Sequence, residues 1–91
     1  MIVHTILKDK SNKPFYHVLI KDKETAIAVA EPILFSFYGK KQIIGERPYK
    51  IVLTDGYWYM EGTLPAGMLG GTFVIITRAK DGQVVFLYHY K

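Results

Sequence analysis

The sequence predicts an α+β fold in which one N-terminal helix packs on a curved four-stranded antiparallel sheet. Apolar residues recur at helical spacing between residues 23 and 38. From residue 49 onward the chain consists of short runs rich in β-branched and aromatic residues, which favour strands. Two junctions between these runs carry Asp-Gly, a strong hairpin signal. A helix followed by hairpins is the order of a two-layer α+β domain.

The helix is predicted over residues 23–38, with Asp22 as its N-cap and Glu24 in its first turn, near the positive end of the helix dipole. Gly39 is predicted to end it as a left-handed C-terminal cap. Pro32 removes one backbone hydrogen bond inside this segment, so we expect a single bent helix. The preceding residues 1–21 are predicted to form an N-terminal extension, linker or extra strand, and residues 22–91 the main domain.

Two hairpins are predicted. The first joins residues 49–54 and 57–61 through Asp55-Gly56, and the second joins residues 72–78 and 83–90 through a turn at residues 80–82. Because alternate side chains of a strand point to opposite faces, Trp58 and Met60 share one face of the sheet. Tyr57, Tyr59 and Glu61 occupy the other.

The hairpins are linked by residues 62–71, which contain four glycines and one proline. Leu64, Met68 and Leu69 make this connection too apolar for an idle surface loop. We expect a shaped loop lying over the sheet, with these three side chains covered.

The composition excludes or disfavours several classes of protein. The 91 residues fit one domain, and the absence of cysteine excludes disulfides and thiolate metal sites. The net charge of +4 comes from lysines scattered over loops and helix ends, with only two arginines, which favours solvated surface over nucleic-acid contact. No apolar run is long enough for a membrane helix, and the first residues do not form a signal peptide. The chain as written is therefore expected in the cytoplasm, or in the periplasm or outside the cell if a leader has been removed.

No reactive constellation stands out. His4, His17 and His89 are far apart in the sequence, and no serine lies in a nucleophile motif, so neither a metal, a cofactor nor a catalytic group is predicted. Exposed aromatic residues remain, because Tyr57, Tyr59, Tyr88 and Tyr90 fall on the predicted free face of the sheet. Tyrosine is enriched at protein interfaces, and ordinary cross-strand pairing is the alternative role.

Several blocks together resemble bacterial immunity proteins of the nuclear transport factor 2-like fold. They are Ala26-Ile27-Ala28-Val29-Ala30-Glu31, Phe37-Tyr38-Gly39, Arg47-Pro48-Tyr49, Tyr57-Trp58-Tyr59-Met60-Glu61-Gly62-Thr63-Leu64-Pro65, Gly70-Gly71, Lys80-Asp81-Gly82 and the closing His89 and Lys91. The resemblance covers residues 22–91 and departs from the pattern at Pro32 and Tyr90.

The resemblance implies a reduced form of that fold and a non-enzymatic protein that binds and neutralises the cognate toxin of a polymorphic toxin system. The implied partner-binding residues are Tyr57, Tyr59, Tyr88 and His89, with Glu31 as a polar anchor and Trp58 if it is exposed. A homodimer through the sheet is a further expectation. The alternatives are a small ligand-binding or enzymatic domain, favoured by an enclosed cavity lined by Glu31, His89 and tyrosines, and a secreted inhibitory or regulatory module.

Overall fold

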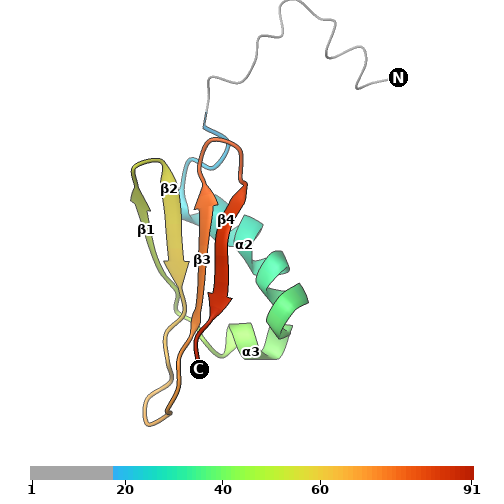
Figure 1. Cartoon of the computed structure of the whole chain (residues 1–91), viewed down its shortest axis with the longest axis vertical. Coiled ribbons are helices and arrows are strands. Elements are labelled where there is room, and N and C mark those ends of the chain that lie inside the picture. Colours follow the sequence, from blue (N-terminus) through green and yellow to red (C-terminus); the bar gives the residue numbers. More distant parts are fainter. Residues whose placement is uncertain (1–17) are drawn as a thin grey trace, which may run out of the picture.

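The computed structural model describes residues 18–91 as a helical layer packed on a four-stranded sheet (Figure 1). The strands follow one another as an antiparallel meander in the order β1-β2-β3-β4. The elements are α2 (Lys23–Tyr38), α3 (Lys40–Ile44), β1 (Lys50–Thr54), β2 (Tyr57–Glu61), β3 (Phe73–Arg78) and β4 (Val84–His89). The predicted fold class is therefore confirmed.

Helix α2 has the predicted bounds. The Asp22 carboxylate accepts a hydrogen bond of 2.8 Å from the backbone N–H of Thr25, and the helix continues through Pro32 as one element. Gly39 ends α2 at φ 90°, a conformation that favours glycine. The sequence did not predict α3, which starts directly after Gly39. This short helix forms because burial of Ile43 against the core holds the turn in place.

Both hairpins lie where the sequence predicts them. Asp55 and Gly56 have φ of 51° and 82°, as expected when both central residues of a two-residue turn are left-handed. The second hairpin is closed by an ion pair of 2.7 Å between Arg78 and Asp81, and β3–β4 pairing is irregular between Ile76 and Thr77. The observed β1, β3 and β4 are one or two residues shorter than predicted.

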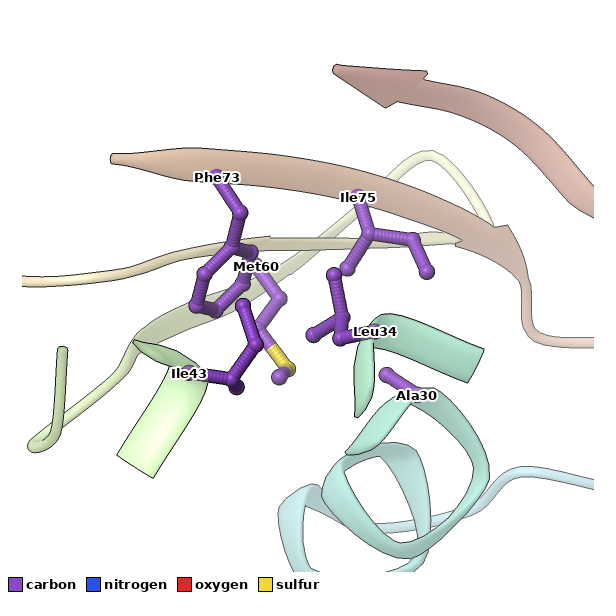
Figure 2. Packing of buried hydrophobic residues seen from close by; sticks show 6 residues of the cluster. All are labelled: Ala30, Leu34, Ile43, Met60, Phe73 and Ile75. Carbon is purple, nitrogen blue, oxygen red and sulfur yellow. The ribbon is translucent and has the colours of Figure 1, made fainter. Parts of the chain in front are cut away.

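The main core joins both helices to the two central strands (Figure 2). Its fully buried members are Ala30, Leu34, Ile43, Met60, Phe73 and Ile75. These residues lie between the helices and one face of the sheet, so that face is filled.

A second cluster places Trp58 against the start of α2, together with Ile20, Ala26 and Ala79. Trp58 is 5% exposed, and its indole Nε1–H donates a 2.9 Å hydrogen bond to the Ile20 carbonyl. The prediction that Trp58 and Met60 share the helix-facing side is confirmed. Trp58 was expected to bind a partner only if it is exposed. It is buried, because the alternation of β2 turns its side chain toward α2.

Most of the predicted extension at residues 1–21, with His4 and His17, lies outside the described residues. In its described part, the backbone N–H groups of Leu19 and Ile20 donate to the carbonyls of Lys80 and Ala79. This segment therefore contacts the β3–β4 turn.

The β2–β3 connection departs from expectation. It extends beyond the ends of the strands, at the end of the sheet where α3 and the C-terminus lie (Figure 1). Leu64, Met68 and Leu69 are exposed, Leu69 to 97%, so the prediction that they are covered is wrong for the chain as described. Turn-forming residues set the local bends of such a loop, whereas its direction depends on contacts at its two bases.

Candidate functional site

The face of the sheet opposite the helices carries a continuous aromatic and aliphatic surface. Strand register places Val52, Tyr59, Ile76 and Phe86 in one row across all four strands. We define the open face as this row together with Tyr57, Val85 and Tyr88. Apart from Ile76, which is half-buried, its members are 37–51% exposed.

The centre of the open face is shallowly hollowed and nearly uncharged, whereas the strand register places Lys50, Glu61 and Arg78 on the same face at the ends of β1, β2 and β3. A depression of about 540 Å³ lies between Tyr57, Tyr59 and Val85, and Asp55 is the one charged residue among those that line it. Toward the other end of β4 the rings of Tyr88 and Tyr90 pack edge to face, with centroids 4.7 Å apart. Such a surface can bury apolar area and donate hydroxyl hydrogen bonds, which suits contact with another protein.

His89 does not lie on the open face. Its position in the strand alternation turns it toward the helices, where its Nε2 is 2.7 Å from Glu46 Oε2 and its ring packs 5.2 Å from that of Tyr38. His89 thus lies in a network with Glu46 and Tyr38, apart from the tyrosines of the open face, and its role as a partner contact stays a prediction.

Glu46 is the centre of that network and is only 2% exposed. Its Oε1 accepts a 2.9 Å hydrogen bond from the backbone N–H of Phe73, and its Oε2 accepts a 2.8 Å bond from Gln42 Nε2. Its carbonyl accepts from the N–H of Thr63 at 2.8 Å. The Glu46 carboxylate thus joins α3, β3 and β4, and the backbone carbonyl of the same residue holds the base of the β2–β3 loop.

Glu31 belongs to a separate network on α2. Its Oε2 accepts hydrogen bonds from Arg47 Nη2 at 2.6 Å and from the hydroxyl of Tyr49. Burial opposes ionisation of Glu31, but the bonds from Tyr49 and Arg47 outweigh it and lower its pKa. Burial and the Glu31 carboxylate together raise the pKa of Tyr49 to about 12. Glu31 therefore lies on the helical layer with its carboxylate already paired.

A second concavity, the end hollow, lies between α3, the β2–β3 loop and the end of the chain. It is open to solvent, has a volume of about 910 Å³, and is lined by Lys40, Lys41, Lys91 and His89 and by Leu64, Met68 and Leu69 of the loop, among others. Glu31 does not line it. It is therefore not the enclosed cavity, lined by both Glu31 and His89, that would favour a ligand-binding or enzymatic domain.

The described residues show neither metal-site geometry nor a membrane helix. Within residues 18–91 there is no group of three or more His, Cys, Asp or Glu side chains placed to hold a metal ion. No helix in that part of the chain combines the length and apolarity needed to cross a bilayer.

Comparison with known proteins decides the family. Residues 25–91 match the model of a family described as NTF2 fold immunity protein. The chain belongs to this immunity protein family. The match agrees with the helix-on-sheet architecture.

Two curated relatives of this immunity protein come from Escherichia coli strain K12. One, described as uncharacterized protein YhhH, is 32% identical over 80% of this chain and 58% of its own length. The other, described as uncharacterized protein YbbC, is 34% identical over 79% of this chain and 60% of its own length. The immunity protein thus spans about 60% of each relative's length. No solved structure matches it significantly.

Sequence reasoning missed Glu46 and the pairing of Glu31 with Arg47 and Tyr49. Arg47 and Tyr49 were visible only as part of a family block, and Glu46 stands in the turn-like segment Gly45-Glu46-Arg47-Pro48. The available signal was a carboxylate next to Gly45 and ahead of an X-Pro step, which is typical of an exposed loop as well. Only its partners, 27 and 43 residues away, identify it as buried.

Proposed function

We propose that this immunity protein neutralises its toxin by binding it directly through the open face and covering the surface that the toxin needs, without catalysing a reaction. One observation supports this most strongly: the open face is aromatic, carries little charge at its centre and is uncovered within residues 18–91. The opposite face is filled by α2 and α3, so it offers no comparable contact surface.

The open face has the features of an anchor-based interface. A stable interface buries about 800 Å² on each partner, with a few central aromatic residues supplying most of the affinity. Tyr59 is the central candidate because its row neighbours are Val52 and Ile76 on the two adjacent strands. Backbone pairing on both sides of β2 holds the Tyr57 and Tyr59 side chains in a fixed orientation, which reduces the entropy lost on binding.

The test uses the protein encoded by the reading frame next to this gene, which we expect to carry the toxin domain. We expect purified chain to bind that domain and to restore growth when both are expressed together. Tyr59→Ala should weaken binding by roughly 30-fold, corresponding to an anchor of about 2 kcal/mol. The matched control is Phe37→Ala, which removes an aromatic side chain that is 65% exposed on the helical layer.

The outcomes distinguish an error in the assigned binding surface from an error in the proposed function. Retained affinity in Tyr59→Ala with a loss in Phe37→Ala would show that the helical layer binds the toxin. Absence of any complex with the wild-type chain would reject direct binding.

A second copy of the chain is the rival occupant of the open face. Sedimentation of the isolated protein tests it. A dimer that Tyr59→Ala dissociates and that persists in the presence of toxin would assign this surface to self-association instead.

A further inference from the structure

The end hollow presents positive charge to solvent. Lys40 and Lys41 begin α3, Lys91 follows β4, and all three are exposed. Glu46 is the one acidic side chain among the residues lining the hollow, and both of its oxygens accept hydrogen bonds within the protein. Its charge is therefore used internally. Within residues 18–91 the three lysines form no ion pair, and the Lys40 Nζ lies 6.0 Å from the centroid of the Phe35 ring.

The same hollow has an apolar lip. Met68 and Leu69 at the tip of the β2–β3 loop are 59% and 97% exposed. Exposed apolar groups of this kind gain about 25 cal/mol for each Å² that a partner covers. Lysine ammonium groups next to exposed apolar side chains are complementary to a ligand that carries both carboxylates and an aliphatic side chain.

The base of the loop is fixed beside β4. The N–H of Tyr90 donates a 3.0 Å hydrogen bond to the Thr72 carbonyl. Gly71 lies so close to Tyr90 that a Cβ there would be 2.6 Å from the Tyr90 Cβ. This close approach requires glycine and holds the loop against the last strand.

We propose that the end hollow binds an acidic segment of the toxin, in which carboxylates contact Lys40, Lys41 and Lys91 and a neighbouring aliphatic side chain packs on Met68 and Leu69. This inference rests on the proposed function and adds a second contact to it. Among the lining residues there is no arginine, a side chain that nucleic-acid sites commonly use, so a polypeptide fits better than a nucleic acid.

The hollow adjoins the open face. Tyr90 lines the hollow, and its ring packs against that of Tyr88 on the open face. One toxin molecule can therefore contact both surfaces, with apolar anchoring on the sheet and charge pairing at its end. Charges at the edge of an interface chiefly raise the association rate, whereas buried anchors chiefly slow dissociation.

The experiment compares binding kinetics of the toxin domain at low and high salt. The double variant Lys40→Glu/Lys41→Glu should lower the association rate by about tenfold at low salt and flatten its salt dependence. The matched control is Lys80→Glu, a charge reversal at an exposed lysine of the β3–β4 turn. Tyr59→Ala should instead raise the dissociation rate and leave the salt dependence unchanged. Equal behaviour of the double variant and Lys80→Glu would reject the hollow as a toxin contact while leaving the open face intact.

A measurement without the toxin tests the end hollow separately from toxin binding by the open face. In an NMR titration, a short peptide of leucine and glutamate should shift the amide signals of Lys41 and Gly70, and the matching leucine and glutamine peptide should not. These shifts should appear even if the toxin domain fails to bind. Absence of shifts with the glutamate peptide, or tighter binding of a single-stranded oligonucleotide at the same residues, would overturn the assignment to an acidic polypeptide.

Discussion

The buried carboxylate of Glu46 provides the sharpest test of the structure. Glu46→Ala removes the acceptor for the Phe73 N–H and the partner of Gln42 and His89. Glu46→Gln keeps one oxygen for Phe73 but places an amide nitrogen near the Gln42 donor. We expect the alanine variant to lose far more stability than the glutamine variant.

The magnitude follows from the contacts. A buried N–H left without an acceptor costs about 1–3 kcal/mol, and each of the other two hydrogen bonds contributes about 0.5–1.5 kcal/mol. Because contacts in one network are not additive, we expect a total near 3 kcal/mol for Glu46→Ala and about 1–2 kcal/mol for Glu46→Gln. For a domain of this size, 3 kcal/mol lowers Tm by roughly 12–24 °C.

Urea unfolding followed by the fluorescence of Trp58 measures these losses, because Trp58 is the single tryptophan and is buried. The control is Glu24→Gln, an exposed carboxylate in the first turn of α2, which should stay within about 0.5 kcal/mol of wild type. Wild-type stability of Glu46→Ala would refute the network, since no buried group could then depend on that carboxylate.

Two further predictions concern the core and the Glu31 network. Trp58→Ala should lower the free energy of unfolding by about 3–5 kcal/mol, measured by circular dichroism during urea unfolding. The fraction of the variant that remains folded should bind toxin as the wild type does. Near wild-type stability would contradict the core position of Trp58. Because the folded-state pKa of Tyr49 is raised from 10.0 to about 12, stabilisation by its neutral phenol is complete below pH 10 and is lost as the pH rises toward 12. Urea midpoints should therefore fall more steeply between pH 10 and 12 in wild type than in Tyr49→Phe, and identical slopes would exclude the proposed pairing with Glu31.

Elements defined by local chemistry were predictable from the sequence. Asp22, Gly39 and the Asp55-Gly56 pair set the ends of α2 and the first hairpin through capping and positive φ, which depend only on neighbouring residues. The period of two along β2 placed Trp58 inward and Tyr57 and Tyr59 outward for the same reason. Three of the predicted contact residues therefore lie together on the open face, namely Tyr57, Tyr59 and Tyr88.

The remaining features depend on contacts between distant residues. Helix α3 is only five residues long and depends on burial of Ile43 against strands that come later in the chain. His89 was placed with the tyrosines because it lies between Tyr88 and Tyr90. Its actual direction follows from the alternation of β4 and from Glu46, a partner that no local pattern reveals.

Glu46 also connects stability to the geometry of the end hollow. A Cβ on Gly62 would lie 2.6 Å from Glu46 Oε1 and 2.8 Å from Glu46 Cβ, so the β2–β3 loop leaves the sheet in direct contact with this side chain. The first residues of the loop are therefore held by Glu46, through its side chain beside Gly62 and through its carbonyl, which accepts from the Thr63 N–H. The open face has no such dependence, because the Asp55-Gly56 turn and the strand register position its residues.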